Sequence, residues 1–408
     1  MNSKQLRQQP DIQIRRERIA NGMATLKGNC RATVLCIPRH GYATTRTTIE
    51  NLYANTAEPF VLLYVDIASP AVVREYLEEQ ARERENFLLV RIKDFVSRQT
   101  ARLVVLDLIT TPFTVFLDNN MLLADGWLDG LISSSERENA AVVSPFIVMQ
   151  GGNVHFSGSR IERLPNGQYR RYQTTEACPS AAPLASVTPE RMDIDFVESH
   201  CCLMRTDAYA PHIEELFIEA MHNAHTLAMA SYQMKTRHGA RMIIEPDVVA
   251  SILPIGFGYD IPWLFASYNR LDWFRASYEV HEKLAGRTAY SVLDNLRWHR
   301  KHLLYLLFSM TEGERLTRND LLAAHEIPTM LNGYDTPVPP HARGQIEKTV
   351  LPWIKRNAPE YLARAKAWIA EIDRIIENID EMEARLARPA RSRRLPTLRW
   401  PGFSRRSA

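Results

Sequence analysis

Four short apolar runs alternate with segments of helical spacing in the first third of the chain. The runs are TVLCIP, FVLLYVD, FLLVRI and FTVFLD, at residues 33–38, 60–66, 87–92 and 113–118. Runs of this length, rich in β-branched residues, are typical of buried strands. The predicted helices lie between them, at residues 44–55, 70–84 and 96–109. Strands that alternate with helices predict βαβ units, and hence an α/β fold with a mostly parallel sheet flanked by helices.

The composition is that of an ordinary globular protein. The 408 residues are 45% apolar, and this length suggests two or three domains. A net charge of +3 is close to neutral for this size, so we expect no nucleic-acid partner. The polar, basic N-terminus lacks the apolar core of a signal peptide, and no run of 18 apolar residues occurs. We therefore expect a cytoplasmic protein without a membrane span.

The cysteines are few and odd in number. Their spacing fits neither a disulfide framework nor a zinc site, so we expect reduced thiols. Cys201 and Cys202 are neighbours on a predicted strand, where their side chains face opposite ways and cannot chelate one ion together. Packing in the core is the expected role of this pair.

Polar residues follow the predicted strands at their carboxyl ends. Pro38, Asp66 and the step Asp118-Asn119-Asn120 fall there, where open α/β sheets bind ligands. The sequence contains neither GxGxxG nor GxxxxGK[ST], so the usual glycine-rich phosphate loops are absent. A carboxylate beside an amide can instead hold a hard divalent cation together with diphosphate oxygens. For Asp66 alone, a turn or helix cap is an equal alternative.

From about residue 31 to about residue 252 the chain resembles the nucleotide-diphosphate-sugar glycosyltransferases of the GT-A fold, in particular the large family 2. The stretches that carry the resemblance are, in order, CIPRHGYATTRTTIENL, VDIASP, PFTVFLDNNMLLADGWLDGL, VVSPFIVMQGGNVHFSG, DFVESHCCLMRTDAY and KTRHGARMIIEPDVV. The third of these stands at the position of the DXD motif. The resemblance implies a Rossmann-like GT-A domain that binds a nucleotide sugar.

Roles for individual residues follow from this resemblance. Asp66 is expected to contact the nucleotide base, and Asp118 and Asn120 the metal and the diphosphate. The expected cofactor is Mn²⁺ or Mg²⁺, and the expected metal ligands are Asp118, Asn120 and His225. An amide at position 120 is a departure from the motif, because it is a poorer cation ligand than a carboxylate. The full predicted donor-binding set is Pro38, Asp66, Ser69, Arg102, Asp118, Asn119 and Asn120.

The catalytic base is the larger departure. In the resembled family a carboxylate takes the proton from the acceptor hydroxyl. The corresponding stretch here, LFIEAMHNAHTLAMASYQMKTRHG, has Ala224 at the glutamate position, followed by His225. Either His225 acts itself, or Glu219 or Glu198 replaces the missing carboxylate, or the chemistry has been lost. His222 and His225, three residues apart on a predicted helix, are otherwise surface residues.

Glu198 and His200 form the predicted acceptor-binding pair. With Cys202 they alternate along a predicted strand and so face the same side. In that position Glu198 would contact acceptor hydroxyls. An internal ion pair is an equal alternative.

The remainder of the chain differs in character. We divide it into a basic N-terminal segment (1–28), the nucleotide-sugar domain (29–254), an aromatic-rich helical subdomain (255–350), and an amphipathic helix with an arginine-rich tail (351–408). The amphipathic helix is expected to dock within the chain or to form a homodimer. The tail, with eight arginines and no acidic residue from position 385 on, either contacts the inner face of an anionic membrane or is solvated.

The sequence thus predicts a metal-assisted, inverting glycosyltransferase of bacterial glycan or glycolipid assembly. Its expected partners are a nucleotide-sugar donor and a glycan or lipid-linked acceptor. Two alternatives stay open: a catalytically impaired scaffold that binds a nucleotide or glycan, and an adaptor that works through the C-terminal helix and tail.

Overall fold

The computed structural model describes residues 2–39, 42, 44–69, 71–94, 96–163, 169–219 and 226–253. The expectations for the C-terminal helical extension, for the arginine-rich tail, and for His222 and His225 lie outside these residues.

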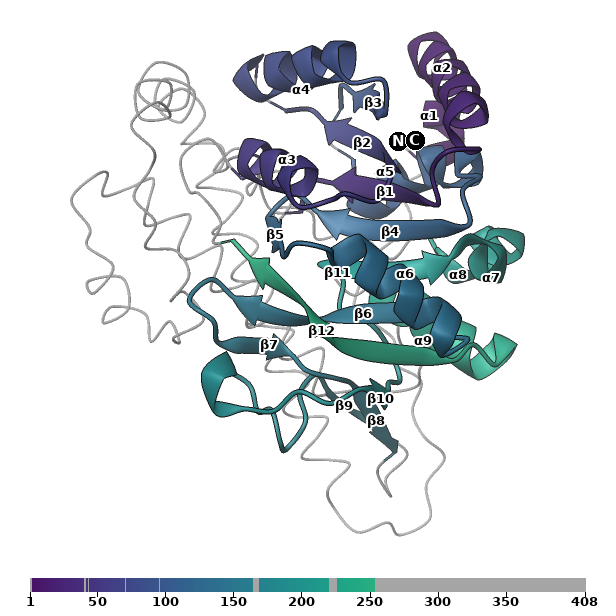
Figure 1. The fold of residues 1–408 in the computed structure, drawn as a ribbon. Helices are drawn as coiled ribbons and strands as arrows, with labels where there is room; N and C mark the ends of the chain where they lie inside the picture. The colour runs from purple at the N-terminus through teal and green to yellow at the C-terminus, as the bar shows by residue number, and fades with distance from the viewer. Residues whose placement is uncertain are drawn as a thin grey trace, which may run out of the picture.

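A ten-stranded mixed sheet forms the centre of the described structure (Figure 1). Eight strands run side by side in the order β10-β12-β6-β11-β4-β1-β2-β3, while β5 pairs with β12 and β7 with β6. Within the eight, β3, β2, β1, β4, β6 and β12 point one way, and β10 and β11 the other. The strands are β1 Ala32–Ile37, β2 Phe60–Ile67, β3 Phe87–Ile92, β4 Phe113–Asp118, β5 Met121–Leu123, β6 Val142–Met149, β7 Val154–Phe156, β10 Met192–Asp193, β11 Cys201–Arg205 and β12 Met242–Ile252. A separate hairpin pairs β8 (Arg160–Arg163) with β9 (Tyr169–Tyr172).

Helices lie on both faces of this sheet, with α6 in front of β6 and β12 and α5 behind β1 (Figure 1). Their bounds are α1 Ser3–Arg7, α2 Pro10–Leu26, α3 Thr45–Ala54, α4 Ala71–Glu83, α5 Arg98–Val105, α6 Trp127–Arg137, α7 Thr206–Tyr209, α8 Ile213–Leu216 and α9 Thr226–His238. Short 3₁₀ turns occupy Leu106–Leu108, Leu184–Ser186 and Ala210–His212. The predicted class, a mostly parallel sheet flanked by helices, is confirmed.

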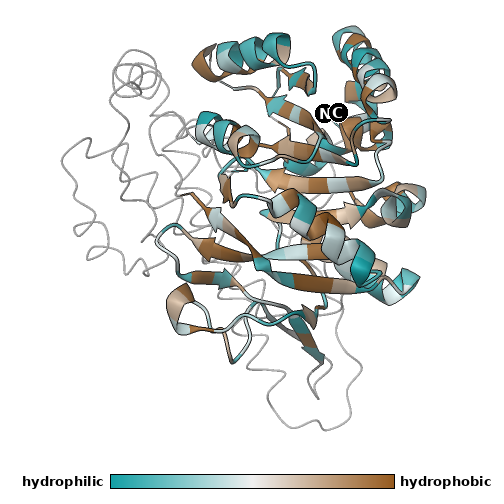
Figure 2. Ribbon diagram, in the orientation of Figure 1, coloured by the Kyte–Doolittle hydropathy of each residue, from teal (hydrophilic) through white to brown (hydrophobic). Residues whose placement is uncertain are grey.

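Burial on both faces explains the continuous apolar runs of the central strands. Every residue of β1, β2 and β4 is buried, as expected for parallel strands covered by helices on each side. These strands accordingly carry mostly hydrophobic residues along their length (Figure 2). Because neither face of these strands meets solvent, apolar residues fill the strands and the charged residues stand at their ends.

The basic N-terminal segment is helical and joins the core. On α2, the side chains of Ile12, Ile19 and Met23 are buried, and the helix packs against β3. Gly22 lets it approach closely, since a Cβ at this position would lie 2.8 Å from a methyl carbon of Leu88. The sequence indicates only a basic segment here, because the charged residues on the outer face of α2 outnumber the buried apolar ones.

The placement of Glu198 and His200 on a strand was wrong. Strand β11 begins at Cys201, and both residues belong to the segment that precedes it. The apolar stretch that follows them made the strand look longer than it is. Cys201 and Cys202 are both fully buried in β11, as the core-packing interpretation predicted.

Candidate functional site

The order of the strands creates one reversal point in the sheet. From β1 the chain adds β2 and then β3 on one side, and afterwards places β4 on the other side of β1. The register pairs Ile37 with Asp118, so the carboxyl ends of β1 and β4 meet at the same edge. In open α/β sheets, ligands bind outside the strand ends at such a point.

Two arginines converge on Asp118 at this edge. Arg39, two residues beyond β1, donates from Nη1 to Asp118 Oδ2 at 2.7 Å. Arg98, the first residue of α5, donates from Nη2 to Asp118 Oδ1. The Asp118 side chain is 1% exposed, and burial lowers the pKa of Arg98 although Asp118 opposes this. Both carboxylate oxygens of Asp118 are therefore held by guanidinium groups.

Arg39 also connects Asp118 to a second carboxylate. It donates from Nη1 to Ser199 Oγ at 3.0 Å, and its Nη2 lies 3.8 Å from Glu198 Oε1. The other oxygen of Glu198 accepts from the backbone N–H of His200 at 2.6 Å and lies 2.5 Å from His200 Nδ1. These contacts form one buried polar network across the edge of the sheet.

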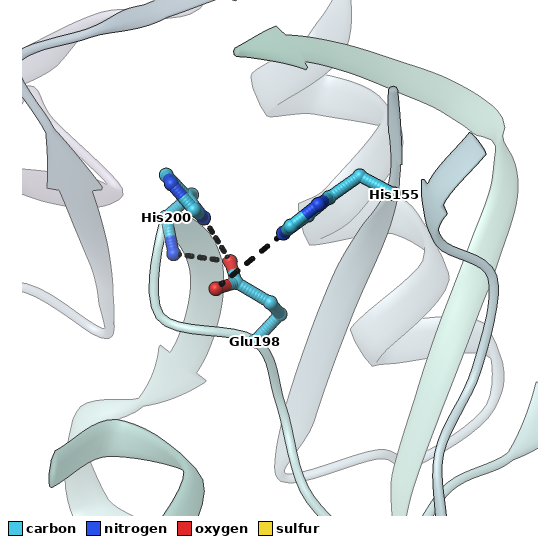
Figure 3. Close-up of side chains that lie close together, drawn as sticks. All are labelled: His155, Glu198 and His200. Carbon is cyan, nitrogen blue, oxygen red and sulfur yellow. Dashed lines mark hydrogen bonds and ion pairs between the residues drawn. The ribbon is translucent and has the colours of Figure 1, made fainter. Parts of the chain in front are cut away.

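His155 on β7 completes a cluster with Glu198 and His200 (Figure 3). Its Nε2 atom lies 3.9 Å from Glu198 Oε1, and the two imidazole rings meet edge to face with centroids 5.3 Å apart. One ligand atom from each of the three residues lies within 4.8 Å of the others. Sequence reasoning paired Glu198 with His200 but missed His155.

Burial and neighbouring charges set the ionisation of this cluster. Burial and the charge of Arg39 lower the pKa of His200 to about 4, so its imidazole is neutral near pH 7. Burial alone would raise the pKa of Glu198, but its contacts with His200 and the positive charge of Arg39 hold it well below its ordinary value. The cluster thus contains an ionised carboxylate beside a neutral imidazole.

Asn119 and Asn120 have different surroundings. Asn119 accepts from the Arg39 backbone N–H at 3.0 Å and donates to Thr45 Oγ1 at 3.0 Å, so it ties β4 to the start of α3. Asn120 donates from Nδ2 to the Leu253 carbonyl at 3.3 Å. Its Oδ1 atom is buried without a hydrogen-bond partner in the described part of the chain. Asn120 therefore offers one free oxygen, while Asn119 is structural.

The family resemblance implies a divalent cation on Asp118 and Asn120, and the described contacts do not fit one there. Each oxygen of Asp118 accepts from an arginine, and only Asn120 Oδ1 has no partner. A cation at this position would have to displace guanidinium groups from a buried carboxylate. At this edge of the sheet, among the residues that the structure describes, His155, Glu198 and His200 have the composition of a metal site.

A second polar group lies at the end of β2. Asp66 pairs in register with Arg91 of β3, and the two side chains form a buried ion pair. Asp66 Oδ1 accepts from the Ser69 backbone N–H at 3.2 Å, and Arg91 donates to Ser69 Oγ at 3.2 Å. Ala68 between them has a φ of 51°, a left-handed conformation that closes the turn. Burial raises the pKa of Asp66, and Arg91 partly offsets this effect.

The remaining predicted residues are spread more widely. Pro38 is buried at the end of β1. Arg102 donates to Gln99 Oε1 at 2.5 Å and to Thr226 Oγ1 at 3.2 Å, and its guanidinium lies 5.5 Å from the centroid of the Phe116 ring. Burial lowers the pKa of Arg102 to about 9. Its described contacts are those of a core residue between α5, β4 and α9.

Glu219 is engaged away from the Asp118 network. Its carboxylate accepts from the backbone N–H of Ser3 and from Ser3 Oγ, the latter at 3.0 Å, at the start of α1. Helix α1 packs on α5, where Arg7 donates to the Leu103 carbonyl, one turn beyond the Arg98 end. Of the three residues proposed for proton transfer, only Glu198 lies in the described site.

Sequence reasoning missed Arg39, Arg91 and Arg98 as well as His155. Arg39 stands directly after a predicted strand, and position alone would have identified it. Arg91 is the parallel-strand neighbour of Asp66, which the register reveals. The fold brings His155 to Glu198 from 43 positions earlier in the chain, and no local pattern marks that approach.

Two other features lie outside this edge of the sheet. His212, Glu215 and His238 form a more exposed cluster in which the two rings stack with centroids 3.9 Å apart. A hollow of about 640 Å³ is lined in part by Glu138, Arg205 and Arg241. Because Arg205 is in register with Phe113, the first residue of β4, this hollow lies toward the opposite edge from Asp118.

None of the described helices combines the length and apolar character needed to cross a membrane.

Comparison with known proteins found no matching family model and no matching curated protein. Similar solved structures include GalNAc-T7 with UDP, GalNAc and Mn²⁺, at 12% identity and a TM-score of 0.46 over 71% of this chain. The chain spans 59% of GalNAc-T7. The mannosyltransferase PcManGT from Pyrobaculum calidifontis, in complex with GDP-Man and Mn²⁺, has 13% identity and a TM-score of 0.41, with 88% of this chain and 94% of that chain covered. S. aureus TarS 1-349 in complex with UDP has 14% identity and a TM-score of 0.39, covering 69% and 81%. Likeness at this level does not by itself assign a family.

Proposed function

We propose that this protein is a glycosyltransferase that moves a sugar from a nucleotide-diphosphate donor to an acceptor hydroxyl. The observation that carries the proposal is the grouping of charged side chains at one edge of the sheet. Asp66 and Arg91 pair near the carboxyl ends of β2 and β3, and Arg39 and Asp118 pair at those of β1 and β4. This edge includes the reversal point of the strand order, where ligands of α/β sheets bind.

The two groups suit different parts of such a donor. Asp66, paired with Arg91, would accept an N–H of the nucleotide base. Arg39 and Arg98 would donate to the diphosphate, because guanidinium groups match phosphate oxygens and keep their charge when buried. Asp118 holds these arginines in place before the donor arrives.

Glu198 and its two histidine neighbours are assigned to the acceptor side of the reaction. They lie beside Arg39, so an acceptor hydroxyl placed there would be close to the sugar-diphosphate bond. Inversion at the anomeric carbon is part of the proposal, because a single displacement by this hydroxyl inverts the centre. We propose glycan or glycolipid assembly as the process. A divalent cation, when bound, would neutralise charge on the leaving diphosphate.

A screen of nucleotide sugars tests the function. The purified full chain is mixed with UDP-, GDP-, dTDP- and CMP-linked sugars, with and without Mn²⁺, and its melting temperature and any slow donor hydrolysis are measured. Binding to the native state raises the melting temperature by mass action. We expect a rise with one nucleotide and release of the free sugar. The absence of both with every donor would refute the proposal.

A donor-binding scaffold is the second candidate. Ala224 at the position of the expected base and the complete pairing of Asp118 with arginines favour it. Turnover separates the two candidates, since a scaffold would show the rise in melting temperature without hydrolysis or transfer. Transfer to any acceptor would exclude the scaffold.

A further inference from the structure

We propose that His155, Glu198 and His200 form a binding site for one divalent transition-metal ion. The resembled motif would place a cation on Asp118 and Asn120, so this proposal moves the ion to the acceptor side of the site. The role of the ion rests on the proposed function, whereas its binding does not.

The separation between His155 and Glu198 suits a shared ion. His155 Nε2 and Glu198 Oε1 are 3.9 Å apart, which is too long for a hydrogen bond. Two atoms that each bind a common ion at about 2.1 Å lie at most about 4.2 Å apart. His200 Nδ1 lies on the other carboxylate oxygen, and both imidazoles point toward Glu198 (Figure 3). A small adjustment of side chains would bring three ligand atoms around one centre.

The surrounding charges allow a cation here. Arg39, the nearest guanidinium, is held 2.7 Å from Asp118 but lies 3.8 Å from Glu198. The positive charges of Arg39 and Arg98 balance the negative charges of Asp118 and Glu198. A divalent ion would therefore give the network a net positive charge. That charge would suit an anionic ligand such as a diphosphate.

Two of the three ligands are buried, and the third is partly exposed. The side chains of Glu198 and His200 are 6% and 7% exposed, whereas that of His155 is 28% exposed. An ion could therefore reach the cluster from the His155 side. Two imidazoles and one carboxylate select borderline ions such as Co²⁺ and Zn²⁺ over Mg²⁺, which prefers an all-oxygen set.

Metal titration without nucleotide tests the site. The full chain is stripped with a chelator and titrated with Co²⁺, Zn²⁺ or Mg²⁺ by calorimetry. All variants carry His238→Ala, which removes a ligand of the exposed His212, Glu215 and His238 cluster. In this background we expect about one Co²⁺ or Zn²⁺ per chain and at least about tenfold weaker binding of Mg²⁺.

Matched variants locate the ion. Because His155 is partly exposed, His155→Ala should fold, which its melting curve checks, and it should bind Co²⁺ at least about tenfold more weakly. Asn120→Ala, the control at the DXD-like step, should bind Co²⁺ as the background does. The visible spectrum of bound Co²⁺ should show imidazole ligation, and it should change in His155→Ala, where only the imidazole of His200 remains.

Three outcomes would overturn the site: no Co²⁺ or Zn²⁺ bound, loss of binding in Asn120→Ala but not in His155→Ala, or equal affinity for Mg²⁺. Failure of the proposed function gives a different result, because the metal would bind while no nucleotide sugar raised the melting temperature. The reverse pattern, donor binding without metal at His155, would leave the function standing and remove this site.

Discussion

Arg39 and Asp118 form a buried ion pair, 2.7 Å from Nη1 to Oδ2, across the strand ends where the sheet reverses its order. One residue follows β1 and the other ends β4. The pair joins the ends of β1 and β4 at the point where a ligand of this fold would bind. Its strength therefore bears on both folding and ligand binding.

Removal of Asp118 should be strongly destabilising. Asp118→Ala leaves Arg39 and Arg98 buried without their shared counter-charge, and breaking a buried pair in this way costs about 3–5 kcal/mol. Urea denaturation measures the loss. The control is Glu136→Ala, which breaks an exposed pair with Arg31 and should cost less than about 1 kcal/mol. Equal effects of the two substitutions would contradict the buried network.

Asp66 should control nucleotide affinity. Asp66→Ala removes a charged hydrogen-bond acceptor for the base, so the affinity for the preferred nucleoside diphosphate should fall by about tenfold or more. Calorimetric titration measures it. Asp107→Ala is the control, because Asp107 is paired with Arg7 and Arg16 away from the strand ends. Unchanged affinity in the Asp66 variant would exclude base recognition at this residue.

Glu245 should make folding stability depend on pH. It accepts from Ser134 Oγ at 2.5 Å and from Arg191 Nη2 at 2.7 Å. Burial opposes these contacts, yet they hold its pKa below the ordinary value. A lowered folded-state pKa stabilises the protein above the unfolded value of about 4.3, and the effect is lost as the pH falls through the folded value.

Glu245→Gln provides the measurement. The difference in unfolding free energy between the parent and this variant should be constant near neutral pH and should shrink as the pH is lowered below about 4.3. Denaturant titrations across this range test the expectation. A difference that does not change with pH would show that the pKa of Glu245 is the same in the folded and unfolded states, against this prediction.

Gly130 should be required where α6 packs on β12. A Cβ at Gly130 would lie 2.6 Å from Val248 Cγ2. Gly130→Ala should therefore cost about 1–3 kcal/mol through overpacking, which exceeds the gain of about 1 kcal/mol in helix propensity. Adding Val248→Ala should recover part of the loss in a double-mutant cycle. Gly28→Ala, which meets no atom within 4 Å, is the control and should not destabilise.

The strands could be predicted closely because their signal is local. The run at 113–118 is β4 to the residue, and the other three predicted runs differ from β1, β2 and β3 by no more than one residue at either end. Each run is short, apolar and bounded by polar residues, which is the pattern of a strand that is buried on both faces. The helices that follow were predicted with similar success, although the last residues of the 96–109 segment form a 3₁₀ turn.

The site was only partly predictable because its contacts are not local. Asp66 and Asp118 were found from their places at strand ends. Their partners Arg91 and Arg98 depend on register and on the direction of α5, which residue spacing does not encode. The DXD-like step marks Asp118 as a carboxylate at a strand end, but a sequence motif does not show whether arginines already neutralise that carboxylate.

The last described strand ends against the DXD-like step. Leu253 donates its backbone N–H to the Asn120 carbonyl at 2.7 Å and accepts from Asn120 Nδ2. These two contacts hold Leu253, the last described residue, beside Asn120. A chain cut after residue 253 would therefore keep the described site, and its affinity for donor and acceptor, compared with that of the full chain, would measure what residues 254–408 contribute.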